Sequence, residues 1–168
     1  FPYSVATIWA YVQQFEWVND NFQLQELLFK RETPEELLDR IEEPHIFCFS
    51  NYVWNYEYNK KVAEAVKKRY PNCLISFGGP QVTKKAKEQK LFEKNPYIDS
   101  ISLGEGERNF SLLLEDYLKG EVKQIYSFDR LQELNFPSPY GLGLFDRMIK
   151  ENPTYNWNAV LETNRGCP

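Results

Sequence analysis

The stretch His45-Ile46-Phe47-Cys48-Phe49, which runs into Ser50-Asn51, decides the predicted fold. Such a short, continuous apolar run is typical of a strand that is buried on both faces of a parallel sheet. The pattern recurs at residues 73–77, which run directly into Gly78-Gly79-Pro80, and at residues 99–103, which precede Gly104-Glu105-Gly106. The sequence therefore predicts three strands of one kind, each followed by a loop of small or polar residues.

Helical patterns separate these strands. One helix is predicted at about 56–70, a lysine-rich one at about 83–94, and a third after residue 107 with its stop at Gly120; a short strand follows at 122–126. Strands that alternate with helices through short loops indicate parallel strands joined by right-handed crossovers. The predicted fold class is therefore α/β, with an open parallel sheet.

The first forty residues predict two further helices and a strand. The first helix is capped by Ser4, and its buried face consists of Val5, Ile8, Trp9 and Val12. Residues 22–29 favour a strand near a sheet edge. Residues 33–36, Thr-Pro-Glu-Glu, form a capping box that starts a short helix.

The chain divides into three predicted parts: the α/β domain at 1–128, a connector at 129–154, and a last segment at 155–168. Pro137 and Pro139 exclude a helix or a central strand around them, which is why the connector is placed there. The last segment contains a predicted strand at 157–162 that leads to no further element. Because the chain also opens on Phe1, we expect it to be part of a longer protein.

The composition fits a globular protein and limits its partners. Of 168 residues, 42% are apolar and 26% are charged, and the net charge of -4 argues against a general nucleic-acid surface. No apolar run approaches the roughly 18 residues of a membrane span. The three cysteines, Cys48, Cys73 and Cys167, are too few for a disulfide framework, so a cytoplasmic location is expected. Cys48 and Cys73 lie within apolar runs and are expected to be buried.

Ligands of open α/β sheets bind beyond the carboxyl ends of the strands. In this chain that edge is predicted at residues 50–55, 78–82 and 104–107. Ser50 and the pair Gly78-Gly79 leave space for the tail of a bulky ligand to approach the backbone. Two ordinary tight turns explain the same residues, and from turn geometry alone they are the simpler interpretation.

Several common chemistries are excluded. Residues 104–109, Gly-Glu-Gly-Glu-Arg-Asn, begin like a dinucleotide-binding loop, but Asn109 replaces the third glycine and the two glutamates would repel a pyrophosphate. No phosphate-binding loop of the GxxxxGK type occurs, and Ser50 stands where a phospho-receiver domain would have a carboxylate. The single histidine, His45, begins a strand at the opposite edge, so a structural role is expected for it.

Cys167 is a candidate of another kind. Gly166 and Pro168 force a turn directly after the strand predicted at 157–162. A thiol on such a turn is a candidate ligand for a metal ion or an iron–sulfur cluster, although one cysteine is by itself a weak signal.

In their order and spacing, these motifs resemble those of the cobalamin-binding radical S-adenosylmethionine (radical SAM) enzymes. Three motifs are similar to the strand ends of that family's cobalamin-binding domain: Ser50-Asn51-Tyr52-Val53-Trp54-Asn55, Gly78-Gly79-Pro80-Gln81-Val82 and Gly104-Glu105-Gly106-Glu107. Pro137-Ser138-Pro139-Tyr140, with Gly143-Leu144-Phe145-Asp146, is similar to the interdomain connector. Residues 162–168 resemble the entry to the CxxxCxxC cluster loop, with Cys167 as its first cysteine.

The resemblance implies a flavodoxin-like (Rossmann-like) domain that binds cobalamin. The implied cofactor-binding residues are Ser50, Asn51, Tyr52, Gly78, Gly79, Pro80, Gly104, Glu105 and Gly106. It also implies that Cys167 is a metal ligand, which with two further cysteines holds a [4Fe-4S] cluster that cleaves S-adenosylmethionine. The longer enzyme would be a methyltransferase acting on an unactivated carbon, and the partner of this domain would be the radical SAM barrel, with no nucleic acid or membrane involved. Compared with the family, the first strand and the barrel are missing, so the chain alone is not expected to be catalytic.

Many cobalamin-binding domains carry a DxHxxG motif, whose histidine replaces the nucleotide base as the lower ligand of cobalt. Counted back from Ser50 by the spacing of that pattern, the motif falls at residues 2–8, which contain no Asp, His or Gly. We expect these residues to form a helix start beneath the corrin. Cobalamin would then bind with its base displaced and without a histidine ligand.

A second interpretation belongs to another functional class. The chain could be a non-catalytic α/β docking module that keeps the fold but has lost cobalamin binding. In that case Tyr52, Trp54 and Tyr56 would form an interaction patch or part of the core.

Overall fold

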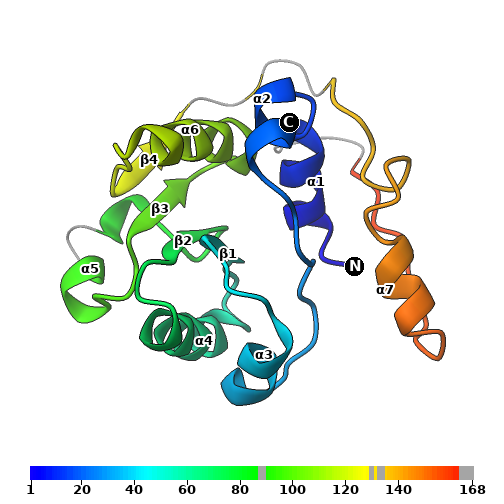
Figure 1. Cartoon of the computed structure of the whole chain (residues 1–168), viewed down its shortest axis with the longest axis horizontal. Helices are drawn as coiled ribbons and strands as arrows, with labels where there is room; N and C mark the ends of the chain where they lie inside the picture. Colours follow the sequence, from blue (N-terminus) through cyan, green and yellow to red (C-terminus); the bar gives the residue numbers. More distant parts are fainter. Residues whose placement is uncertain (87–89, 129–130, 132–134, 163–168) are drawn as a thin grey trace.

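The computed structural model describes residues 1–86, 90–128, 131 and 135–162, and its centre is an all-parallel sheet of four strands in the order β1-β2-β3-β4 (Figure 1). The strands are β1 (Ile46–Ser50), β2 (Leu74–Gly78), β3 (Ser100–Leu103) and β4 (Ile125–Ser127). The predicted α/β fold class is confirmed, and the strand order follows the chain.

Helices cover both faces of the sheet (Figure 1). On one side α1 (Tyr3–Val12) packs beside α6 (Gly106–Lys119), and on the other α3 (Pro34–Arg40) packs beside α4 (Tyr56–Arg69). The shorter helices are α2 (Glu16–Asn21), the 3₁₀ helix η1 (Lys84–Ala86), α5 (Leu91–Lys94) and α7 (Asp146–Glu151). None of the helices in the described ranges is long and apolar enough to cross a bilayer.

Large apolar side chains fill the α4 side of the sheet. Alternate residues of the first three strands point to this side and form one buried cluster with α4: Phe47, Phe49, Ile75, Phe77, Ile101 and Leu103. Burial of a side chain of this size is worth about 1.5–3 kcal/mol. This layer therefore anchors the sheet, and the apolar runs in the sequence predicted it.

Two predicted helix signals are confirmed. The Thr33 hydroxyl accepts from the Glu36 N–H (3.3 Å), and the Glu36 carboxylate accepts from the Thr33 N–H (2.9 Å), which completes the capping box of α3. These hydrogen bonds hold the pKa of Glu36 below its ordinary value. At the end of α6, Gly120 takes the left-handed conformation (φ 72°) that the sequence predicted for its stop.

β1 is an edge strand, whereas its sequence predicted burial on both faces. Within the described residues it pairs with β2 alone, and Cys48 in its middle is exposed rather than buried. Cys73 is buried, as predicted. The prediction of burial on both faces failed because Phe47 and Phe49 pack on the α4 side, whereas Cys48 points to the opposite side, and an apolar run cannot report what covers each face.

Two predicted strands are wrong. Residues 22–29 and 157–162 belong to no β-ladder of the described structure. In the first of them, Leu27 instead packs with Ala6, Phe145 and Met148. A strand-like composition forms a strand only where a neighbour supplies hydrogen-bond partners, and local pattern cannot report that neighbour.

The helix predictions need three corrections. Pro2, not Ser4, precedes α1, and Ser4 lies within its first turn. The buried residues of α1 are Ala6, Thr7, Ala10 and Val12, so only Val12 of the predicted face is fully buried. The lysine-rich region forms η1 and α5, with residues 87–89 outside the described ranges, and α2 and α7 were not predicted.

Candidate functional site

The loops after β1 and β2 are joined at the carboxyl edge of the sheet. Ser50 pairs in register with Gly78. The Asn51 N–H donates to the Gly78 carbonyl oxygen (2.8 Å), and the Gln81 N–H donates to the Asn51 carbonyl oxygen (3.0 Å). The structure therefore brings together the first two motifs that the sequence selected.

The buried side chain of Asn51 joins the ends of β1 and β2 by hydrogen bonds. Asn51 is fully buried, and its side-chain amide donates to the carbonyl oxygens of Phe49 and Gly78, each at 3.1 Å. Its own amide oxygen accepts from Asn59 (2.9 Å), while Asn55 donates to the Ser50 carbonyl oxygen (3.0 Å). Sequence reasoning missed this network, although the spacing of four residues between Asn51, Asn55 and Asn59 was a visible signal.

Gly79 is required by the chain's own backbone. It has a φ of 90°, and a Cβ at this position would lie 2.7 Å from the Asn51 nitrogen and 2.8 Å from its carbonyl oxygen. The sequence allowed two interpretations of this glycine, the approach of a ligand or an ordinary tight turn, and in the described structure the close approach is to the neighbouring loop. A Cβ on Gly78 would lie 3.6 Å from the Ser102 Cβ, an ordinary contact.

The third loop is fixed by packing against α1. A Cβ on Gly106 would lie 2.3 Å from the Ile8 Cδ1 atom, so this glycine permits the close crossing of α1 and α6. The fully buried Asn109 donates to the carbonyl oxygens of Leu103 and Glu105, both at 2.9 Å. Gly104, with a φ of 81°, has no atom within 4 Å of where a Cβ would stand.

Small side chains line the α1/α6 side of the sheet. Cys48, Ser76 and Ser100 lie in register across β1, β2 and β3, and the next row consists of Ser50, Gly78 and Ser102. This contrasts with the phenylalanine-rich opposite face. The Ser100 hydroxyl is buried and has no hydrogen-bond partner among the described residues, whereas Cys48 is exposed. In the carboxyl half of this face the first three strands therefore carry small side chains.

The start of α1 reaches the same edge. The Ser4 and Ser50 hydroxyl oxygens lie 3.3 Å apart. The sequence prediction placed Ser4 as a helix cap and missed this pairing. His45, at the amino end of β1, is exposed and lies five positions before Ser50, about 16 Å away at 3.3 Å per residue. It therefore lies at the opposite edge, as predicted.

The loop after β1 presents aromatic residues. Tyr52 is partly buried and stacks on Trp54, with ring centroids 4.6 Å apart. Trp54 is 67% exposed and Val53 is 76% exposed. In the second loop Pro80 is also exposed. All of these residues belong to the two loops that follow β1 and β2.

Cys167 lies outside the described residues. Within the described ranges, no group of three or more His, Cys, Asp or Glu side chains could hold a metal ion. The role of Cys167 as a cluster ligand thus stays a prediction.

A cavity of about 470 Å³ lies elsewhere, between residues 19–32 and α7. Most of its charged lining is internally paired: Arg40 contacts both Glu26 and Glu32 (2.5 Å to Glu32), and Arg147 contacts Glu151 (2.7 Å). It contains none of the strand-end residues, so the candidate site remains the carboxyl edge.

The fold and this edge define an open-sheet α/β domain of the kind that takes its ligand beyond the strand ends. The chain is 34% identical, over 99% of its length, to the cobalamin-dependent radical SAM methyltransferase TokK of Streptomyces tokunonensis. It is 32% identical, again over 99%, to the 2-(S-pantetheinyl)-carbapenam-3-carboxylate methyltransferase of Streptantibioticus cattleyicolor. The resemblance to the cobalamin-binding radical SAM enzymes is confirmed: the chain is homologous to a part of them and spans 27% of the length of either relative.

Two further comparisons add no functional information. No family model matches the chain. The N-terminal domain of a hypothetical protein from Thermotoga maritima is 20% identical and has a TM-score of 0.47, with 76% of this chain and 92% of that one covered.

Proposed function

We propose that this chain is the cobalamin-binding domain of a radical SAM methyltransferase that acts on an unactivated carbon. The observation that carries the proposal is the small-residue face of the sheet below Ser50, with α1 beside it. The names of the two relatives support it, since one states cobalamin dependence and both state methyl transfer.

The residues at this edge fit cobalamin, which has a broad ring rimmed by amides and a nucleotide tail. The Ser4 and Ser50 hydroxyls and the open space at Gly104 would face the ring and the start of the tail. The buried Ser100 hydroxyl lacks a partner among the described residues, although buried polar groups normally have one. A polar atom of the tail would satisfy it.

When bound, cobalamin supplies a cobalt atom that carries a methyl group. The chain's own residues would hold it in place: the Asn51 network and Gly79 fix the first two loops, and Gly106 lets α1 lie close to the third. The tail would occupy the side of the sheet that carries Cys48, Ser76 and Ser100.

The remaining chemistry would lie in the longer enzyme. There Cys167 would be the first of three thiolates around a [4Fe-4S] cluster that acts with S-adenosylmethionine. The other two cysteines, Cys48 and Cys73, lie within or next to strands of the sheet, so Cys167 would be the one cluster ligand from this chain. One thiol cannot hold such a cluster. We therefore propose that the chain is not catalytic by itself and that its partner is the radical SAM barrel.

Titration with hydroxocobalamin tests the cofactor proposal. The protein is titrated and the visible spectrum of the corrin is followed; a saturable change with one cobalamin per chain is expected. A response that grows linearly without saturation would remove the proposal. It would favour the docking module, in whose predicted patch of Tyr52, Trp54 and Tyr56 the exposed Trp54 would contact the partner.

A further inference from the structure

The side chain of Tyr140 binds both backbone groups of Val160, a residue of the last described segment. Its hydroxyl accepts from the Val160 N–H (2.8 Å) and donates to the Val160 carbonyl oxygen (3.0 Å). These are the two groups that a neighbouring strand would bind. A single side chain thus replaces the strand partner that residues 157–162 lack in the described structure.

The ring of Tyr140 is anchored at the start of α1. It lies 4.9 Å from the ring of Phe145, which is 1% exposed, and meets Phe1 edge-on at 5.8 Å. Its ring centroid also lies 6.0 Å from that of Tyr3, in the first turn of α1. The hydroxyl that binds Val160 therefore belongs to a ring with several fixed neighbours.

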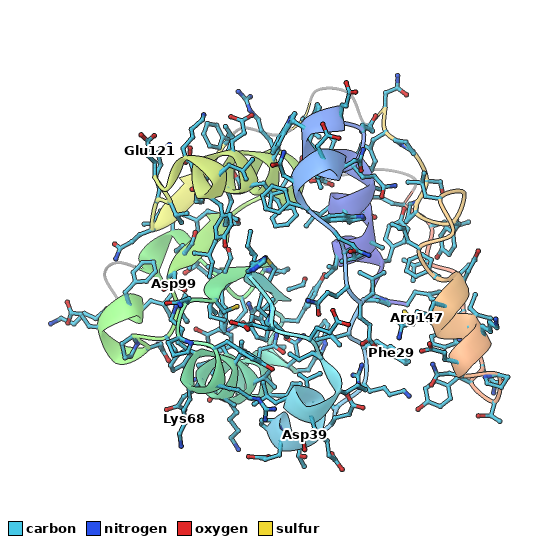
Figure 2. All side chains as sticks on the ribbon, in the orientation of Figure 1. Phe29, Asp39, Lys68, Asp99, Glu121 and Arg147 are labelled. Carbon is cyan, nitrogen blue, oxygen red and sulfur yellow. The ribbon has the colours of Figure 1, made fainter. Side chains whose placement is uncertain are left out.

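Trp157 attaches the same segment at a second point. Its ring stacks on Phe1 (4.8 Å, 15°) and contacts Phe29 (5.3 Å), while its indole N–H donates to the Asn152 carbonyl oxygen (3.3 Å). Figure 2 shows Phe29 on the extended segment that runs beside α7, the helix of Arg147. Two attachments three residues apart fix both the position and the direction of the segment.

We infer that Tyr140 is a positioning residue that, together with Trp157, sets the path of residues 157–160 relative to the candidate cobalamin site. The link is α1: Tyr3 contacts Tyr140, and the next residue, Ser4, contacts Ser50. The first turn of α1 thus contacts the carboxyl edge of the sheet through Ser4 and contacts Tyr140 through Tyr3. The two hydrogen bonds between Tyr140 and Val160 are called the clamp from here on. In the sequence, Cys167 follows Val160 by seven residues (167 minus 160), so the predicted cluster loop begins shortly after the positioned segment. This functional meaning rests on the proposed function; the clamp itself does not.

Distances between two spin labels test the clamp directly. Lys61→Cys on α4 and Leu161→Cys, which is 77% exposed in the wild type, carry the labels. Cys48→Ser and Cys167→Ser remove the other reactive thiols, and the buried Cys73 is left in place. A narrow distance distribution is expected by pulsed electron paramagnetic resonance. Tyr140→Phe, which keeps the ring and removes the hydroxyl, should broaden it at least twofold.

Tyr155→Phe is the matched control. It removes a hydroxyl from the same aromatic group, but no hydrogen bond of that hydroxyl is seen in the described structure, so the distribution should stay narrow. Equal widths for Tyr140→Phe and the wild type, or a broad distribution in the wild type itself, would overturn the inference. Hydroxocobalamin is absent from this experiment. A chain that shows the clamp but fails to bind cobalamin would therefore refute the proposed function alone.

Discussion

The hydroxyl oxygens of Ser4 and Ser50 lie 3.3 Å apart, although 46 residues separate them in the chain. The contact joins the first turn of α1 to the carboxyl end of β1. In the proposed function both hydroxyls would face the ligand. The pair is therefore the most direct point at which to test the proposed site.

Ser50→Leu should lower the affinity for hydroxocobalamin at least tenfold, which corresponds to about 1.4 kcal/mol. The larger side chain would fill the space beside Ser4 that the ligand needs. Ser127→Leu is the control, because Ser127 is exposed on β4, at the other edge of the sheet. Visible titrations of both variants measure the effect. Unchanged affinity in Ser50→Leu would place the ligand elsewhere.

Gly79→Ala and Gly104→Ala should differ in their cost to stability. Both glycines have positive φ, which costs an alanine about 1–2 kcal/mol. At Gly79 the new methyl group would also press on the Asn51 backbone, so a total loss of about 2–4 kcal/mol is expected. Urea unfolding at constant temperature measures both free energies. Equal losses would show that the loop can move away from Asn51.

Gly106→Ala should destabilise the chain by about 1–3 kcal/mol, because its methyl group would overlap the Ile8 side chain. Ile8→Ala removes that obstacle. In the double variant the alanine at position 106 should therefore cost less than it does alone, with a coupling energy of about 1 kcal/mol or more. Additive losses in the four unfolding curves would argue against a close crossing of α1 and α6.

Asp116 should make the fold sensitive to acid. Its burial alone would raise its pKa, but the hydrogen bonds from Lys123 (2.9 Å) and the Tyr126 hydroxyl (2.9 Å) outweigh that effect and lower it. In the unfolded chain the pKa of an aspartate is near 3.9, and in the folded chain the pKa of Asp116 is lower. The stabilisation by Asp116 is therefore complete above the unfolded pKa and is lost as the pH falls through the folded pKa.

The measurement is the free energy of unfolding between pH 6 and about pH 3, the range in which an aspartate of ordinary pKa becomes protonated. Asp116→Asn should be less stable than the wild type at pH 6 and should show a smaller further loss on acidification. Asp20→Asn, at an exposed position, should keep the slope of the wild type. Parallel curves for Asp116→Asn and the wild type would contradict the assignment.

The cobalt of bound cob(II)alamin should have no nitrogen ligand from this chain. The single histidine lies at the amino end of β1, and the first turn of α1 brings a serine hydroxyl to Ser50. The electron paramagnetic resonance spectrum should therefore lack nitrogen superhyperfine splitting, with the base displaced. His45→Ala should leave the spectrum unchanged. Nitrogen splitting would contradict this prediction.

The sequence was sufficient to predict the parts of the fold that depend on local pattern. The runs at 45–49, 73–77 and 99–103 predicted β1, β2 and β3, and hence the edge at which Ser50 and Gly78 meet. It did not predict that residues 22–29 stay outside the sheet or that Cys48 is exposed. Both depend on which neighbours a segment finds, a property of the whole chain.

The carboxyl edge at which the candidate site lies was predicted, whereas the interactions at that edge were not. The strand-end motifs lie at the predicted edge. The side chain of Asn51, however, binds a backbone carbonyl of the protein itself, and Gly79 leaves room for the backbone of the neighbouring loop. Ser4 was assigned to a helix cap because its local sequence fits one. Its contact with Ser50 arises from the packing of α1, over a separation that no short pattern spans.

The edge position that β1 has among the described residues has a practical consequence for handling this chain. Its five residues, Ile46–Ser50, include no lysine or proline, the residues that commonly prevent a sheet edge from pairing with another molecule. Cys48 is the central residue, so antiparallel pairing of two such edges about a twofold axis would set the two thiols opposite each other. Directly opposed residues have Cα atoms about 4.5–5.5 Å apart, which lies within the range that a disulfide bridges. Concentrated stocks therefore need a thiol reductant, and covalent dimers on a non-reducing gel that Cys48→Ser abolishes and Cys167→Ser does not would identify this strand as their origin.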